Sequence, residues 1–249
     1  MSGLLFVWAF VVGRARCHDR IMHDLDTTPP FASLVRETTV IADVARYALR
    51  GRRVARVYEG RGRPVMVIPG FLATDGFTIP LRRALASAGY RSFGWGLGRN
   101  TGVAADIFER LDRQLDVMLR DTDDPVALVG WSLGGLIARE YAKHAPGRVE
   151  RVITLGSPFS GDIRANHAWR LYERVNGHPV DRLPIPVTLA VKPPVPTTAL
   201  WSRADGIVAP GSSRGQAGEA DRMVELSCTH MGFVVAEEAL AAVLQALRG

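Results

Sequence analysis

The sequence has little cysteine and no long apolar run, and each of these features excludes a class of protein. Cys17 and Cys228 are the only cysteines in 249 residues. Two cysteines are too few for a disulfide framework, and their positions match no metal or redox spacing. We therefore expect no bridge between them, and a reducing compartment. Because no apolar stretch approaches the roughly 20 residues that a membrane helix needs, the sequence predicts a globular protein without a membrane span.

Lysine is also scarce, so the positive charge rests on arginine. Lys143 and Lys192 are the only lysines, and 31 basic against 25 acidic residues give a formal net charge of +6. The arginines are spread along the chain except for the run Arg50-Gly-Arg-Arg53, which has no interleaved aromatic residue. This distribution is typical of a solvated surface rather than a nucleic-acid interface, so we expect no nucleic-acid partner.

Residues 1–30 are interpreted as a peripheral, unordered or mis-assigned leader, and residues 31–249 as a single domain. Residues 4–12 are apolar, but no charged side chain precedes them and no cleavage site of small residues follows. Three interpretations remain open: a targeting segment, a peripheral part of the mature protein, and translation that starts at Met22. We favour a cytoplasmic protein, whereas a targeting role for residues 1–13 would make it secreted or membrane-peripheral.

Residues 31–49 carry apolar side chains at helical spacing, which predicts an amphipathic helix outside the main sheet. Its polar face mixes both signs of charge, which makes attachment to a membrane surface the weaker alternative. Beyond it, apolar strand-like segments alternate with helical ones. The expected strands are residues 64–68, 90–95, 126–129, 149–155, 197–202 and 224–228, and the expected helices are residues 80–89, 103–119, 133–145 and 234–247. This alternation predicts an α/β fold with a mostly parallel central sheet and helices on both faces.

Residues 159–195 break the alternation. They combine a polar helical segment at residues 163–175 with several prolines, which predicts a small cap or lid inserted after a strand. The apolar residues of this segment either line a pocket or anchor the insertion to the core. These residues are Trp169, Leu171, Tyr172 and Val175.

The most informative stretch is Gly130-Trp-Ser132-Leu-Gly134-Gly135, between an apolar strand and a helix. A Gly-x-Ser-x-Gly motif in this context places the serine at a sharp strand-to-helix turn, with its Oγ above the edge of the sheet. Gly130 and Gly134 are required there because a Cβ would collide with the neighbouring backbone. The N-terminus of the helix favours negative charge developing close to Ser132.

With this context the chain resembles the α/β-hydrolase family, particularly its lipases and esterases, over residues 60–249. The resemblance implies a nucleophile, an acid and a histidine in that order along the chain, each just beyond a strand. Ser132, Asp205 and His230 meet this order. Asp162 is the alternative acid, because some lipases place this residue after the preceding strand. The other histidines do not follow a strand after the candidate acid, so the resemblance assigns His230 as the base.

The resemblance also implies an oxyanion hole made by backbone amides. The sequence Pro69-Gly70-Phe71 stands where the family usually has His-Gly, directly after a strand. The N–H of Phe71 is therefore expected as one donor, and the N–H of Leu133, which follows the nucleophile, as the other. The missing histidine leaves these donors intact because the backbone supplies them.

The implied activity is hydrolysis of carboxylic esters of moderately hydrophobic acyl groups through an acyl-enzyme. No metal or organic cofactor is needed, and the glycine-rich loop at residues 94–100 lacks the features of a phosphate loop. We expect a small-molecule ester or lipid as partner, with contact to a lipid interface as a further alternative. The rival functions are an acyltransferase that uses the same triad and a noncatalytic binding protein on the same fold.

Overall fold

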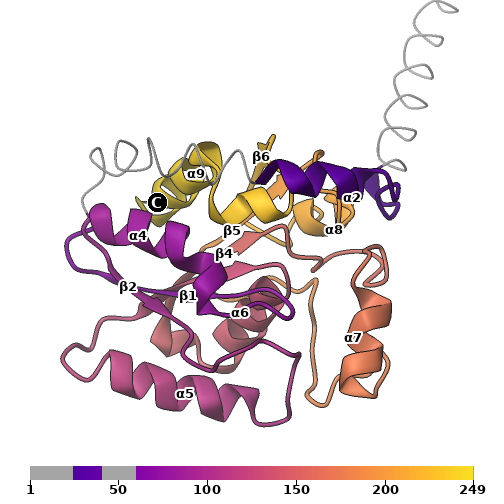
Figure 1. Ribbon diagram of the computed structural model, residues 1–249. Coiled ribbons are helices and arrows are strands. Elements are labelled where there is room, and N and C mark those ends of the chain that lie inside the picture. The colour runs from indigo at the N-terminus through magenta and orange to yellow at the C-terminus, as the bar shows by residue number, and fades with distance from the viewer. Residues whose placement is uncertain (1–24, 41–59, 249) are drawn as a thin grey trace, which may run out of the picture.

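The computed structural model describes residues 25–40 and 60–248 (Figure 1). Cys17, the arginine run at residues 50–53 and the second half of the helix expected at residues 31–49 lie outside the described residues. Cys228 is buried.

A six-stranded parallel sheet forms the centre of the molecule, with the strand order β2-β1-β3-β4-β5-β6. The strands are β1 (Pro64–Ile68), β2 (Arg91–Gly94), β3 (Val126–Trp131), β4 (Val149–Leu155), β5 (Thr197–Ser202) and β6 (Arg222–Leu226). Every pair of neighbouring strands runs parallel. The order of the strands reverses between β1 and β3, so the carboxyl ends of the central strands border a crevice where ligands commonly bind. The predicted sheet is confirmed.

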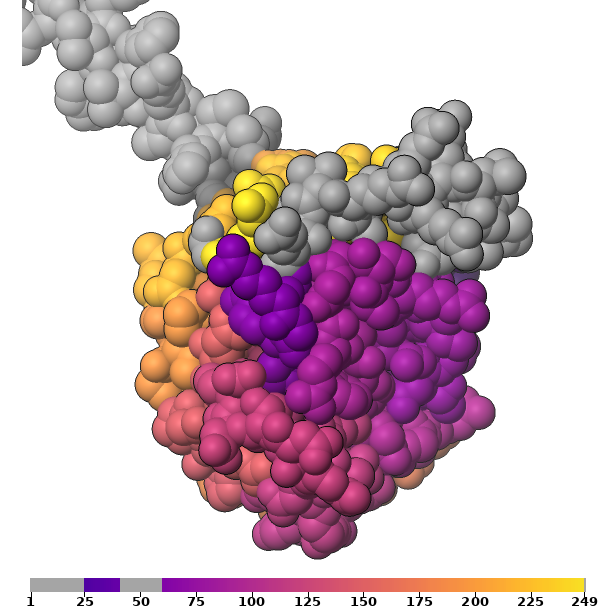
Figure 2. All heavy atoms as spheres, turned by 90° about the vertical axis from the view of Figure 1, so that its left-hand side faces the viewer, coloured from indigo at the N-terminus to yellow at the C-terminus, as the bar shows by residue number. Residues whose placement is uncertain are grey.

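The helices lie in two layers, one on each face of the sheet. Their bounds are α2 (Ser33–Arg36), α4 (Ile79–Ser87), α5 (Ile107–Met118), α6 (Leu133–His144), α7 (Trp169–Asn176), α8 (Pro210–Arg214) and α9 (Glu237–Arg248). Helices α4 and α9 cover one face, whereas α5 and α6 cover the other (Figure 1). Viewed from the side of β2 and α4, the residues around α5 form the base and the C-terminal residues lie at the top (Figure 2).

Strand β3 shows why helices must cover both faces of the sheet. All six of its residues are buried. Ala127 and Val129 pack in the core with α4 and α9, whereas Val126 and Leu128 pack in the core with α5 and α6. Because successive side chains of a strand point to opposite faces, a continuous apolar run is the expected pattern for a strand buried on both sides.

The insertion between β4 and β5 contains a shorter helix than the sequence predicted. A helix was expected at residues 163–175, but α7 begins only at Trp169. Short polar side chains account for the difference, because they hydrogen-bond the local backbone into a turn. The Asp162 carboxylate accepts from the Arg164 N–H, and Asn166 bonds both the Ile163 carbonyl and the Ala168 N–H. In the same way, Val103 lies before α5 rather than within the helix expected from residue 103.

Residues 25–40 lie against the body of the protein, beside α8 (Figure 1). Leu25 and Pro29 are buried. The Pro29 carbonyl is 2.7 Å from Nε2 of His167 in the insertion. Leu25 and Pro29 of the expected leader are thus packed, whereas residues 26–28 and 30 are exposed and residues 1–24 lie outside the described residues. Of the expected helix, the structure has α2 followed by the 3₁₀ helix η1 (Glu37–Thr39). Within the described ranges, no helix is both long enough and apolar enough to cross a membrane.

Helix α5 offers a direct test of the packing. Leu111 is 1% exposed, whereas Val117 in the same helix is 58% exposed. We expect Leu111→Ala to lower the free energy of unfolding by about 2–5 kcal/mol, because it leaves a cavity between helix and sheet. The control Val117→Ala should change it by less than about 0.5 kcal/mol. Chemical denaturation of both variants measures the difference, and equal losses would contradict this packing.

Candidate active site

Ser132 occupies the sharp turn between β3 and α6. Its backbone angles are φ 54° and ψ −121°, a strained conformation for a residue with a side chain. A Cβ on Gly130 would collide with the backbone of Gly134 and Gly135, and a Cβ on Gly134 would collide with the Ile68 carbonyl. The close approach of β1, β3 and α6 therefore requires these glycines. Ser132 itself is half-buried and borders an open cleft.

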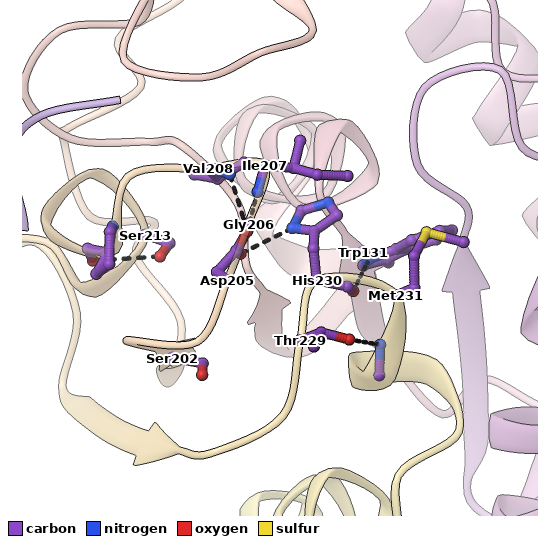
Figure 3. A network of polar contacts seen from close by, with 12 residues as sticks. Trp131, Ser202, Asp205, Gly206, Ile207, Val208, Ser213, Thr229, His230 and Met231 are labelled. Carbon is purple, nitrogen blue, oxygen red and sulfur yellow. Dashed lines mark hydrogen bonds and ion pairs between the residues drawn. The ribbon is translucent and has the colours of Figure 1, made fainter. Parts of the chain in front are cut away.

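Asp205 and His230 form a buried pair beyond the ends of β5 and β6. Their exposed fractions are 2% and 3%, and His230 Nδ1 lies 2.8 Å from Asp205 Oδ2 (Figure 3). The other carboxylate oxygen accepts the N–H groups of Ile207 at 2.9 Å and Val208 at 2.8 Å. Both oxygens of Asp205 are thus engaged, which fixes the plane of the carboxylate and with it the orientation of the imidazole.

This pair lies at the same edge of the sheet as Ser132. The indole Nε1 of Trp131, the residue before Ser132, donates to the His230 carbonyl at 3.1 Å, and the two rings are 5.7 Å apart (Figure 3). Gly156, at the end of the adjacent strand β4, approaches Asp205 so closely that an added Cβ would lie 2.9 Å from its Oδ2. A hydrogen bond from Ser132 Oγ to His230 Nε2 stays a prediction.

The environment of His230 favours its protonated form. Burial alone lowers the pKa of a histidine, because a charge is costly to desolvate. The charge of Asp205, its hydrogen bond and the charge of Glu37 outweigh burial and raise the pKa of His230 above its ordinary value. The ring can therefore accept a proton more readily than an isolated buried imidazole, which is the property required of a general base.

The two residues expected to supply the oxyanion donors, Phe71 and Leu133, line the same cleft as Ser132. In the described part of the chain, neither the Phe71 N–H nor the Leu133 N–H has a hydrogen-bond partner. Leu72, which follows Phe71, adopts a left-handed conformation with φ 59°. Asn100 is fully buried and holds this loop in place, since its Nδ2 donates to the Pro69 carbonyl and its own carbonyl accepts the Leu72 N–H, both at 2.7 Å. These roles as donors stay predictions.

An open apolar cleft extends from Ser132 along α6 toward Glu140, with about 740 Å³ of empty space when the solvent at its opening is included. Eight residues of helix separate these two positions, which corresponds to roughly 12 Å. Trp169 and Tyr172 of α7 line the cleft, so they form part of its wall rather than only an anchor. Leu171 and Val175 are instead exposed by 47% and 44%. Phe71 also faces the cleft and packs against Tyr172, with 5.4 Å between the rings.

The competing residues lie elsewhere. Asp162 is exposed and bonds the local backbone. His144 stacks on Phe108, whereas His167 and His178 contact backbone carbonyls near the insertion. Among the described residues, His230 is the histidine that contacts Asp205. The described residues contain no group of three or more His, Cys, Asp or Glu side chains arranged to hold a metal ion.

The sequence analysis missed two residues that support this site. Asn100 ends the glycine-rich loop at residues 94–100, to which the sequence analysis assigned no role in the site. Glu37 was expected only as part of the polar face of a helix, yet its carboxylate reaches the loops of Asp205 and His230. No local pattern identifies either residue, because both act on segments far away in the sequence.

Comparison with known proteins agrees with this architecture. A family model described as the alpha/beta hydrolase fold matches residues 63–184. The solved structure of a metagenome-derived lipolytic enzyme superposes with a TM-score of 0.55 at 16% identity, covering 77% of this chain and 95% of that one. At this identity the likeness shows the fold alone.

Two curated relatives carry the name pimeloyl-(acyl-carrier protein) methyl ester esterase. The protein from Aliivibrio salmonicida is 33% identical over 117 residues, which cover 45% of this chain and 42% of the relative. The protein from Vibrio campbellii is 40% identical over 62 residues, which cover 25% and 24%. The chain therefore spans less than half the length of these relatives.

The contact between Asp205 and His230 predicts a specific electrostatic effect. Replacing Asp205 by Asn removes the charge that stabilises the imidazolium, so the pKa of His230 should fall. NMR titration of the imidazole resonances measures this value. Asp162→Asn is the matched control and should leave the titration unchanged. The opposite ranking of the two variants would identify Asp162 as the partner.

Proposed function

We propose that this chain, a member of the α/β-hydrolase superfamily, hydrolyses carboxylic esters with Ser132 as the nucleophile. The observation that carries the proposal is the buried Asp205–His230 pair at the edge of the sheet where Ser132 opens onto an apolar cleft. The family model and the fold support a hydrolase, and the names of the curated relatives support an ester as the bond that is cleaved.

The mechanism follows from the weak nucleophilicity of a serine hydroxyl. His230 accepts the proton of Ser132 Oγ through Nε2 while Oγ attacks the acyl carbon, and Asp205 stabilises the resulting imidazolium. The same proton passes to the leaving alcohol as the ester bond breaks. Water, activated in turn by His230, then cleaves the acyl-enzyme and releases the carboxylic acid. No redox step or organic cofactor enters this sequence.

The oxyanion of each tetrahedral intermediate would lie between the N–H groups of Phe71 and Leu133. Both amides have no partner within the described chain, so they are available as donors without breaking an existing bond. One such donor accounts for on the order of a 10²- to 10³-fold rate effect in enzymes of this type. Asn100 contributes indirectly, because it holds the Pro69–Leu72 loop that carries the first donor.

The cleft determines the class of ester that we propose. Its walls are mostly apolar, as in most small-molecule sites, and Ser132 lines it together with residues of α6 and of the insertion. An acyl chain lying along α6 would be removed from water over most of its length. We therefore propose an ester of an extended apolar acyl group, including lipid esters, as the substrate.

Ser132→Ala tests the identity of the nucleophile. Without Oγ, no acyl-enzyme can form, so hydrolysis of p-nitrophenyl esters should fall by at least about 10⁴-fold and labelling by a fluorophosphonate probe should disappear. Ser157→Ala is the control, because Ser157 is fully buried behind the turn and should leave activity within about twofold. Unchanged turnover in Ser132→Ala would refute the assignment. Adding a competing alcohol distinguishes hydrolysis from acyl transfer by the product formed.

Val187→Trp tests the direction of the acyl chain. Val187 lines the cleft, and the adjacent Thr188 N–H donates to Glu140 at the far end of the cleft. A bulky ring there should lower kcat/KM on long-chain p-nitrophenyl esters on the order of tenfold, while short-chain esters change by less than about twofold. Val191→Trp, at an exposed position in the same loop, is the control. A uniform loss across chain lengths would argue against an acyl chain along α6.

A further inference from the structure

Glu37 lies far from the motif residues in sequence but contacts both loops of the catalytic pair. Its Oε1 accepts the N–H of Gly206 at 2.9 Å and the N–H of His230 at 3.0 Å. Its Oε2 accepts the N–H of Met231 at 2.8 Å. One carboxylate therefore links the loop that carries the acid to the loop that carries the histidine.

The three amides that Glu37 binds are ones that need an external acceptor. His230 and Met231 begin the 3₁₀ helix η5 (Met231–Val234), and the first N–H groups of a helix have no partner within it. Gly206 directly follows Asp205, and an added Cβ there would lie 3.0 Å from Glu37 Oε1. A negative charge at the start of a helix is favourable, and a charged acceptor strengthens each hydrogen bond.

Glu37 is held by an anchored segment. Leu25 is buried, the Pro29 carbonyl contacts Nε2 of His167, and the Phe31 ring packs edge-on against His167 at 6.2 Å. The segment therefore touches the cap insertion at one end and the catalytic loops at the other. Glu37 sits where η1 begins, so its position is set by the docking of the whole segment.

We propose that Glu37 is a positioning residue, which fixes the backbone of His230 relative to Asp205 and so aligns the imidazole with Ser132. The proposal rests on the ester hydrolysis proposed above. Glu37 is not a catalytic residue, because its carboxylate binds backbone amides rather than a reacting atom. The competing explanation is that these bonds serve only to attach residues 25–40 to the protein.

The rate of the chemical step separates the two explanations, and the charge of Glu37 supplies an independent check on its link to His230. The charged groups that face His230 are Asp205 from the loop after β5 and Glu37 from the N-terminal segment, whereas Trp131 and Phe233 present uncharged rings. Both carboxylates raise the pKa of His230. Removing the charge of Glu37 should therefore lower this pKa, whereas a loss of kcat is expected only if Glu37 also aligns the imidazole.

The test compares Glu37→Gln, Glu37→Ala and the control Glu219→Gln in the full chain. Gln keeps one oxygen for Gly206 and His230 but presents an NH₂ group to the Met231 N–H, and it carries no charge. Glu219 also accepts a backbone N–H, from Gln216, in the loop before β6. We expect kcat to fall on the order of tenfold for Gln and 10²-fold for Ala, with KM within about twofold, because the chemical step depends on alignment.

The pH profile supplies the second readout. With the negative charge removed, the pKa of His230 falls, so the acidic limb of kcat/KM should move to lower pH in both Glu37 variants and stay in place in Glu219→Gln. If both Glu37 variants lower only the thermal midpoint, with kcat and the acidic limb of the parent, Glu37 merely attaches the segment and the proposal is wrong.

NMR titration separates failure of this proposal from failure of the proposed function. If the parent hydrolyses no ester and a fluorophosphonate does not label Ser132, the hydrolase assignment fails. The imidazole of His230 can still be titrated in the parent and in Glu37→Gln. A lower pKa in the variant would support the link between Glu37 and His230, and an unchanged pKa would overturn it.

Discussion

The buried contact between Asp205 and His230 is the interaction on which the geometry of the site depends. An isolated carboxylate removed from water costs several kcal/mol, so it persists only where hydrogen bonds and an opposite charge compensate for lost hydration. Here the compensation comes from two successive backbone amides and the imidazole. The turn after β5 must therefore wrap around the carboxylate, and the loop after β6 must bring the ring to it. The positions of both loops follow from this requirement.

At Ser132 the constraint comes from close packing of the backbone rather than from polar contacts of a side chain. The strained angles of the serine persist because β1, β3 and α6 approach so closely that Gly130 and Gly134 admit no Cβ. As a result, Ser132 and Leu133 both line the cleft. Packing thus positions the proposed nucleophile and one proposed oxyanion donor together, whereas polar contacts position the proposed base and acid.

Local sequence patterns predicted the features that depend on local structure. The apolar run of β3 and the glycines around Ser132 identify the strand, the turn and the helix, because the whole pattern lies within a short continuous stretch of sequence. Asn100 and Glu37 were missed because they act on distant segments: Pro69 lies 31 residues from Asn100, and Gly206 lies 169 residues from Glu37. The start of α7 was predicted too early for another reason: Asp162 and Asn166 compete for the backbone, which an apolar periodicity does not register.

Helix α6 runs along the cleft from Ser132 to Glu140 and forms one of its walls. Ser132 precedes its first turn, and Arg139, two turns further on, is fully buried. The Arg139 guanidinium donates to the carbonyls of Leu189 and Val191 and lies 4.0 Å over the ring of Phe159. Burial lowers the pKa of Arg139 to about 10, so it stays charged at neutral pH and binds these carbonyls strongly. Because one helix holds Ser132 at one end and contacts the loop at residues 189–191 through Arg139, the distance between them is set by the helix. We therefore infer that α6 and Arg139 together fix the length of the cleft between Ser132 and this loop.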